Sequence, residues 1–348
     1  MPAELPPAVR SALVTGGYRS GWWAVRRMPE STARALFSRL ATDVHRRRGR
    51  AVRQLEQNLA RVAPGASQAE LRALSLDSLR SYFRYWCEAF RLPVTDAAEA
   101  AARVDVANPE RLLDPMRAGR GAVVALPHMA NWDLAGVWSV HAGMPVSTVA
   151  ERVRPEALFE RFCTYRRALG IDVLPLSGVD GGPPQADPTV VLASRLRAGG
   201  LVCLLADRDI SARGQRVRLL DAPARMPAGP AVLARRTGAA LIPVTLWYEG
   251  ERMRMQLHPE VTASAGTRLR DAVPAMTQQV ADVFTAGIRE HPADWHMMQR
   301  VFVDSSGPPV SAGTVPGTIA GSGPGAGPGP AFEVPAPDAA PYGARAQG

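Results

Sequence analysis

Short apolar segments alternate with amphipathic ones from about residue 107 to residue 290. Apolar runs of four to eight residues between turn signals are typical of buried strands, and apolar residues at a spacing near 3.6 are typical of helices. This alternation predicts an α/β fold, a single domain whose central, mostly parallel or mixed sheet is flanked by helices. We expect strands at residues 121–126, 145–150, 171–174, 201–206, 240–247 and 252–257, and helices at residues 132–141, 155–169, 188–198, 227–237 and 269–290.

Three regions of different composition follow one another along the 348 residues. Residues 1–106 are predicted to be a helical, basic, membrane-associating part of the domain, with helical segments over 13–62 and 68–90. Residues 107–304 form the expected α/β core, which would hold the site. Residues 305–348 are rich in glycine, proline and alanine, and such a segment is expected to be disordered because it buries too little apolar area.

Arginine supplies all the basic charge of the chain, because its 41 basic residues include no lysine and the net charge is +9. Such a surplus suits an anionic membrane surface, a phosphate-bearing ligand such as coenzyme A, or nucleic acid. A GC-rich genome would also produce this bias. No helix-turn-helix or base-stacking motif is evident, so we expect no nucleic-acid partner.

The chain is expected to meet a membrane from the side, as a peripheral protein on the cytoplasmic face of the inner membrane. Its first residues do not have the pattern of a signal peptide, and no apolar run reaches about 18 residues. Trp22 and Trp23 beside arginines resemble an interfacial segment, although an ordinary helix would have the same pattern. Cys87, Cys163 and Cys203 are too scattered for a disulfide framework or zinc site, which fits a reducing compartment and no metal.

A histidine and an aspartate follow the first strand of the core, in the run Pro127–Asp133. Neutral imidazole has the basicity to take a proton from a hydroxyl near pH 7, and a carboxylate can fix its tautomer and stabilise the imidazolium. This predicts His128 as a general base and Asp133 as its orienting partner. No Gly-x-Ser-x-Gly elbow accompanies them, so the reacting hydroxyl should belong to a substrate. The bare spacing also fits a structural histidine.

The run Pro127–Asp133 resembles the His-x4-Asp motif of the lysophospholipid acyltransferase superfamily, in the form found in bacterial lipid A biosynthesis acyltransferases. The resemblance extends over about residues 10–303. Four further segments carry it in the same order, namely Val149–Val153, Phe159–Arg166, Leu204–Asp209 and His291–Gln299.

This resemblance implies transfer of a fatty acyl group, palmitoyl-like, from the cosubstrate acyl-CoA to a lipid hydroxyl, with no resident cofactor. Within the family the chain is most similar to actinobacterial members that act on mannosylated phosphatidylinositol lipids, which implies the 6-hydroxyl of a mannose as acceptor. The resemblance also implies substrate-binding positions in the active-site cavity, namely Asn131, Glu151, Arg166 and Asp207.

Two positions depart from the family pattern. Asp207 stands where relatives commonly have glutamate, and Ala130 stands where many have glycine, which matters only if the backbone there has a positive φ. His291, Trp295 and His296 are expected to support the core rather than react.

Three alternatives remain open. The chain could acylate another glycolipid or a lysophospholipid. The same histidine and aspartate could activate water in a hydrolase, or the protein could be a non-enzymatic basic membrane-binding protein.

Overall fold

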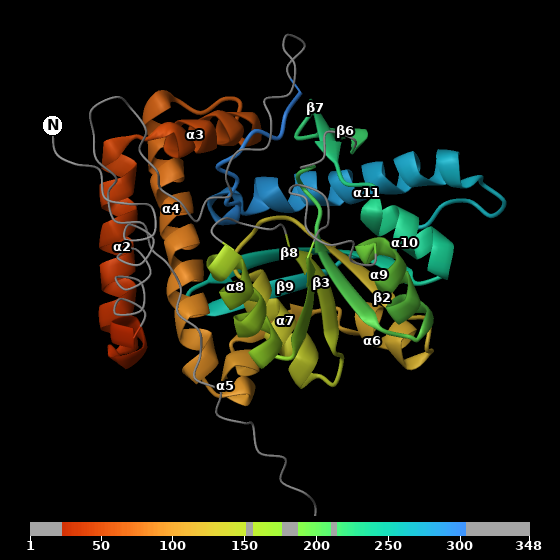
Figure 1. The fold of residues 1–348 in the computed structure, drawn as a ribbon. Coiled ribbons are helices and arrows are strands. Elements are labelled where there is room, and N and C mark those ends of the chain that lie inside the picture. The colour runs from red at the N-terminus through yellow and green to blue at the C-terminus, as the bar shows by residue number, and fades with distance from the viewer. Residues whose placement is uncertain (1–22, 151–155, 176–186, 210–213, 304–348) are drawn as a thin grey trace, which may run out of the picture.

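The fold is seen in a computed structural model that describes residues 23–150, 156–175, 187–209 and 214–303 (Figure 1). The N-terminal part of the expected helical region, residues 13–22, and the expected disordered tail, residues 305–348, lie outside the described residues. So does most of the glycine- and proline-rich stretch around residues 178–186.

A seven-stranded mixed sheet forms the centre of the molecule, in the order β1-β9-β8-β2-β5-β3-β4. The five strands from β8 to β4 run parallel, whereas β9 is antiparallel to β8 and pairs in parallel with β1. The predicted α/β class with a mostly parallel, mixed sheet is therefore confirmed. The strands are β1 (Val104–Ala107), β2 (Ala122–Leu126), β3 (Val146–Ala150), β4 (Ile171–Pro175), β5 (Leu201–Leu205), β8 (Ala240–Glu249) and β9 (Arg252–Leu257).

Helices cover both faces of this sheet. Thr245 of β8 lies against Gly287 of α11, and Ser147 of β3 accepts a hydrogen bond from Arg195 of α9, so these two helices share one face. Helix α10 contacts both of them. The helices of this face are α9 (Pro188–Arg197), α10 (Gly229–Thr237) and α11 (Leu269–Glu290), those of the opposite face are α6 (Glu110–Arg117) and α7 (Trp132–His141), and α8 (Glu156–Ala168) packs beside β4.

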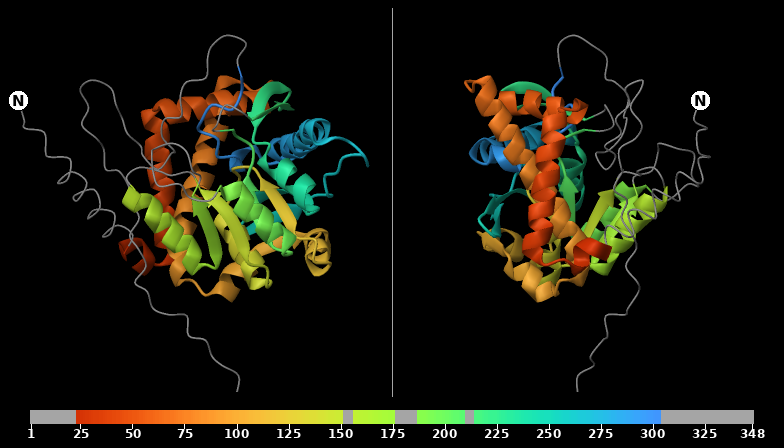
Figure 2. Two further views of the ribbon diagram at one scale, coloured as in Figure 1. Left: turned by 45° about the vertical axis from the view of Figure 1, so that its right-hand side comes forward. Right: turned by 90° about the vertical axis from the view of Figure 1, so that its left-hand side faces the viewer.

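The N-terminal helices form a layer against one side of this core, where α2 lies along α4 (Figures 1 and 2). Phe37 of α2 packs edge-on against Phe83 and Phe90 of α4. The helical region breaks at Arg48, which ends α2 in a left-handed conformation at φ 46°. The helices of this layer are α2 (Glu30–Arg47), α3 (Arg50–Val62), α4 (Gln68–Arg91) and α5 (Ala97–Ala102), and a 3₁₀ turn, η1 (Leu92–Val94), follows α4.

The sequence did not predict the shortest elements. β1 has only four residues and lies at the sheet edge, slightly before the expected start of the core, and α5 and α6 have six and eight residues. The hairpin of β6 (Gln215–Leu219) and β7 (Ala222–Met226) turns through Leu220 and Asp221, both at positive φ. A two-residue hairpin turn of this kind normally contains glycine or asparagine, so its usual signal is absent here.

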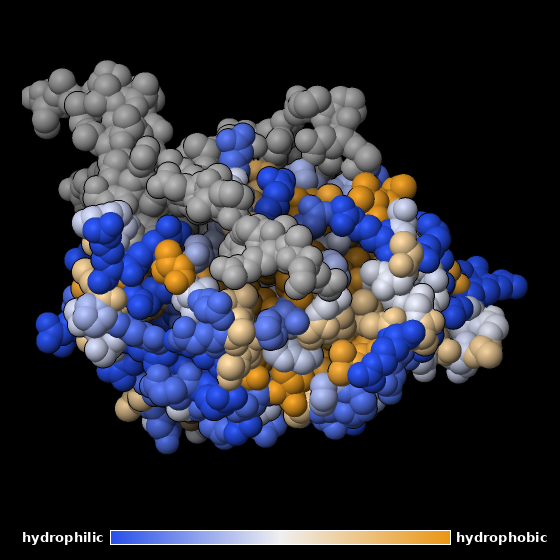
Figure 3. Space-filling model, turned by 90° about the horizontal axis from the view of Figure 1, so that it is seen from below, coloured by the Kyte–Doolittle hydropathy of each residue, from blue (hydrophilic) through white to orange (hydrophobic). Residues whose placement is uncertain are grey.

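No helix within the described part of the chain is both long and apolar enough to cross a bilayer. The face seen from below has hydrophobic residues gathered near its middle and hydrophilic residues around them (Figure 3).

Candidate active site

His128 and Asp207 meet because they follow neighbouring parallel strands at the same offset. Leu126 at the end of β2 is paired with Leu205 at the end of β5, and each is followed two residues later by one of these side chains. The His128 Nδ1 lies 2.5 Å from Asp207 Oδ1, and the His128 backbone N–H donates to Asp207 Oδ2 at 2.9 Å. One carboxylate therefore holds both the ring and the main chain of His128.

The Asp207 carboxylate is fully buried but surrounded by donors. Its Oδ2 also accepts a hydrogen bond from Trp295 Nε1 at 2.9 Å. Burial raises the pKa of Asp207, but the His128 charge and the hydrogen bonds from His128 and Trp295 together lower it by more than burial raises it. The pKa of Asp207 therefore lies below its ordinary value. A charged Asp207 accepts the Nδ1–H of His128, which leaves Nε2 as the ring nitrogen with a free lone pair. The His128 side chain is 26% exposed, so substrate can reach it.

Asp133 lies on the first turn of α7 and is paired with other groups. Arg166 of α8 donates to both Asp133 oxygens, at 2.7 and 3.3 Å, and the Tyr85 hydroxyl of α4 donates to Oδ2 at 3.0 Å. Burial lowers the pKa of Arg166, but the charges of Asp133 and Tyr85 and the hydrogen bond to Asp133 together raise it more, so the guanidinium stays charged. The same carboxylate and burial raise the pKa of Tyr85 well above its usual value.

This arrangement differs from the expected one, in which Asp133 orients His128. The structure places Asp207 against the imidazole, because β5 adjoins β2, whereas the first turn of α7 directs Asp133 toward α4 and α8. Sequence spacing alone points to the aspartate that is near in the chain. Spacing does not point to the aspartate at the end of the neighbouring strand, which only the family resemblance placed in the active site.

Asn131 serves as the N-cap of α7. Its side-chain oxygen accepts from the Leu134 backbone N–H at 2.9 Å, and its amide nitrogen donates to Glu88 at 2.9 Å. The side chain is fully buried. The substrate contact expected for Asn131 stays a prediction, and this geometry favours a role in fixing the start of α7. Glu151 lies outside the described residues.

An apolar cavity lies between α7 and the sheet, beside the Asp133–Arg166 pair. It has a volume of about 70 Å³ that water-sized molecules can occupy, and it is partly open to solvent. Its lining includes residues from α7 (Trp132, Asp133, Ala135, Gly136, Ser139), Arg166, and strand residues such as Val124, Leu126, Val149, Cys203 and Leu205.

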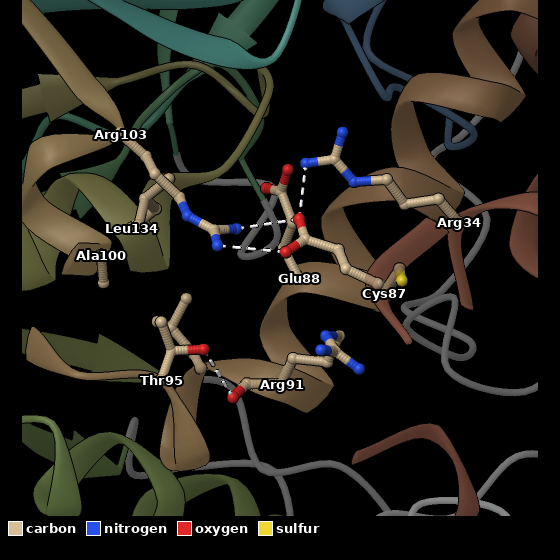
Figure 4. A pocket seen from close by; sticks show the side chains of 10 residues that line it. Arg34, Cys87, Glu88, Arg91, Thr95, Ala100, Arg103 and Leu134 are labelled. Atoms are coloured by element: carbon tan, nitrogen blue, oxygen red, sulfur yellow. Dashed lines mark hydrogen bonds and ion pairs between the residues drawn. The ribbon is translucent and has the colours of Figure 1, made fainter. Parts of the chain in front are cut away.

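A second cavity, lined by α2, α4 and α5, contains charged side chains that pair with each other (Figure 4). Glu30 forms ion pairs with Arg34 and Arg103. Arg91 donates to the backbone oxygens of Val25 and Met28. This network joins the helical layer together, and we assign it no role in chemistry.

The C-terminal segment pairs with the loop that carries His128. The Ala130 backbone N–H donates to the backbone oxygen of Asp294 at 3.0 Å. The His296 backbone N–H donates to the backbone oxygen of His128 at 2.8 Å. Met129 and Trp295 form an antiparallel bridge between these contacts. We call residues 294–298 the C-terminal strap. The sequence indicated it only as support for the core, and it gave no signal for the contact of Trp295 with Asp207 or of Tyr85 with Asp133.

The fold thus brings a histidine and a buried aspartate together at the end of β2, near an apolar cavity, and a pair of this kind can act in acid–base catalysis. Residues 13–303 match the family model of the bacterial lipid A biosynthesis acyltransferases, and the chain belongs to this family. It is 47% identical over 284 residues to a phosphatidylinositol mannoside acyltransferase of Mycolicibacterium smegmatis, covering 81% of this chain and 89% of that protein. It is 42% identical over 301 residues to a protein of the same name from Mycobacterium tuberculosis, covering 86% and 92%.

Proposed function

We propose that this protein transfers a fatty acyl group from acyl-CoA to a mannose hydroxyl, the 6-hydroxyl, of a phosphatidylinositol mannoside. The observation that carries the proposal is the His128–Asp207 pair at the open end of the sheet beside an apolar cavity. The relatives above, by their names, act on this class of lipid.

His128 acts as the general base in this proposal. Its Nδ1–H is held by Asp207, so Nε2 accepts the proton of the mannose hydroxyl as the oxygen attacks the thioester carbon. The new carbon–oxygen bond forms, the carbon–sulfur bond breaks, and the proton on Nε2 passes to the departing coenzyme A thiolate. Asp207 stabilises the imidazolium in between, because a buried carboxylate that stays charged favours the protonated ring.

In this proposal Asp133 takes no direct part in the proton transfer and has a structural role. A buried ion pair that loses one partner leaves an uncompensated charge, so Asp133 and Arg166 hold each other and fix α7 against α8. This pair also lines the cavity, where it places two charged side chains beside otherwise mostly apolar residues. We place the acyl chain in that cavity.

The basic N-terminal layer would bring the site to its lipid substrate. Trp23 is 58% exposed, with the Arg27 guanidinium 4.4 Å from its ring centroid, and Leu36 of α2 is 38% exposed; Arg46 and Arg47 lie in the last turn of α2. Arginines near an anionic leaflet contribute about 1 kcal/mol each to membrane binding. We therefore propose peripheral docking on an anionic membrane surface, at the cytoplasmic face.

The test uses the full chain with palmitoyl-CoA and purified phosphatidylinositol mannosides in mixed vesicles, with products identified by mass spectrometry. We expect an acylated mannoside and free coenzyme A, with fragmentation placing the acyl group on a mannose 6-hydroxyl. Replacement His128→Ala should reduce turnover by about 10²-fold to 10⁴-fold, the usual contribution of a general base.

The matched control is His141→Ala, which changes an exposed histidine at the C-terminal end of α7, the helix that follows the His128 loop. It should leave turnover unchanged. Near-normal turnover in His128→Ala would contradict the proposed mechanism. Release of free fatty acid at the same rate without any mannoside would indicate a hydrolase instead.

A further inference from the structure

Trp295 is the largest fully buried side chain of the described structure, and its indole is directed at the partner of the proposed base. The indole N–H donates to Asp207 Oδ2 at 2.9 Å, and the same oxygen accepts the backbone N–H of His128 at 2.9 Å. The other oxygen, Oδ1, lies 2.5 Å from His128 Nδ1. The two oxygens of Asp207 therefore have different tasks, one fixed by donors and one facing the imidazole.

The indole is itself held in place by the strap that carries it. Ser78 of α4 donates to the Trp295 backbone oxygen at 3.0 Å. Asn58 of α3 donates to the backbone oxygens of Met297 and Gln299 at 2.7 and 2.8 Å. The antiparallel bridge to Met129 joins the strap directly to the loop that carries His128. A donor fixed in this way can restrain the group it contacts.

A carboxylate needs such restraint because its terminal torsion is broad and nearly two-fold. With only the His128 groups as partners, the Asp207 carboxylate could tilt about its Cβ–Cγ bond and shift the His128 ring with it. The indole N–H at Oδ2 removes that freedom. Hydrogen bonds to a charged group are among the stronger ones in proteins, so this contact is suited to the purpose.

We propose that Trp295 is a positioning residue for acyl transfer, which acts through Asp207 to hold the His128 imidazole in its reactive orientation. This inference rests on the proposed function. It gives the C-terminal strap a role in the reaction in addition to its role in packing.

The variant Trp295→Phe keeps an aromatic ring and removes only the donor. Loss of a hydrogen bond to a charged group predicts a fall in kcat of about 10-fold to 100-fold. KM should change little, because the indole contacts the catalytic pair and not the cavity lining. The matched control is Trp247→Phe, which changes a tryptophan that stacks on His291 at 4.2 Å, and it should leave kcat unchanged.

A double-mutant cycle with Asp207→Asn separates positioning from general loss of packing. If Trp295 acts through Asp207, Trp295→Phe should cause little further loss in the Asp207→Asn background. An equal fold-loss in both backgrounds would overturn the proposal, and so would an unchanged kcat in the single variant.

Proton NMR supplies a readout that does not depend on turnover. The Nδ1–H of His128 should give a low-field resonance that disappears in His128→Gln and Asp207→Asn. In Trp295→Phe we expect this resonance to move upfield or to broaden, and in Trp247→Phe to stay. An unchanged resonance in Trp295→Phe would refute the positioning role. If the parent protein transfers no acyl group to mannosides, the proposed function fails, while the resonance still decides whether Trp295 positions the pair.

Discussion

Ala130 is a residue near the site whose backbone departs from what its side chain favours. It lies two positions after His128, is fully buried, and has a φ of +43°. A residue with a β-carbon in the left-handed region costs about 1–2 kcal/mol relative to glycine. The condition set out from the sequence, a positive φ at this position, is therefore met.

Replacement of Ala130 by glycine should relieve this strain while it removes a buried methyl group. The fitting control is Ala125→Gly in β2, because that alanine is equally buried and lies in regular strand. We expect Ala130→Gly to be less destabilising than Ala125→Gly by about 1–2 kcal/mol in chemical denaturation. Equal losses of unfolding free energy in the two variants would show that Ala130 carries no strain.

At the same scale, the role of His128 as a general base stays a prediction, whereas the side chain that contacts its ring, Asp207, differs from the one expected from the spacing. His128 could be predicted because a histidine directly after a buried strand lies at the open end of a parallel sheet. Asp207 was expected near it only from the resemblance, and Asp133 was assigned the partner role because it is close in sequence. The identity of the partner depends on β5 lying next to β2, which the pattern of apolar residues does not determine.

Among the elements, α7 links the His128 loop to the apolar cavity. Gly136 lies on the buried face of this helix, where a β-carbon would come within 2.7 Å of Ile171 Cδ1. Both residues line the cavity. The absence of a side chain at this position therefore leaves room for whatever fills the cavity.

Replacement Gly136→Ala should displace the Ile171 side chain and shorten the space available to an acyl chain. We expect the ratio of turnover with palmitoyl-CoA to turnover with lauroyl-CoA to fall, while helix propensity favours alanine by about 1 kcal/mol. Competition between the two donors, read by mass spectrometry, measures this ratio. Gly229→Ala, at the start of α10 with no atom within 4 Å of the added carbon, should leave it unchanged. An unchanged ratio in Gly136→Ala would mean that the acyl chain lies elsewhere.

Elements with a strong periodic pattern were predicted best. The bounds of α7, β9 and α11 agree with the expected ranges. Every second residue of β9 is buried and α11 is amphipathic, whereas α7 is apolar around most of its surface and is marked at its start by the Asn131 cap. The edge strand β1 and the hairpin of β6 and β7 were missed, since a four-residue strand and a turn without glycine give little local signal. Their positions depend on tertiary contacts, such as the pairing of β1 with β9.

At the scale of the whole molecule, a buried polar cluster joins the helical layer to the sheet. The Ser81 hydroxyl of α4 lies 2.5 Å from Asp294 Oδ1 and 2.8 Å from His296 Nε2, and Asp294 Oδ2 accepts from the Tyr248 backbone N–H of β8. Burial lowers the pKa of His296 to about 3, with a smaller contribution from the His128 charge. The ring is therefore neutral in the folded protein at any ordinary pH.

This depressed pKa makes the stability of the fold depend on pH. The unfolded chain protonates His296 near pH 6.5, whereas the folded protein does not until about pH 3, so stability present above pH 6.5 is lost as the pH falls. We expect the stability advantage of the parent over His296→Gln to shrink by about 2 kcal/mol between pH 7 and pH 5. Urea denaturation at several pH values measures it, with exposed His141→Gln as the control. A constant difference would mean that His296 titrates alike in both states.

The strap is also one of the last parts of the described domain to be synthesised. A ribosome makes β2 and β5 early and residues 294–298 near the end of the described domain, after the last strand of the sheet has been made. A chain that stops before Trp295 would contain every strand, His128 and Asp207. It would lack the donor to Asp207 Oδ2 and the bridge to Met129. The full rate of the proposed reaction would thus require a segment that is made only after every strand of the sheet.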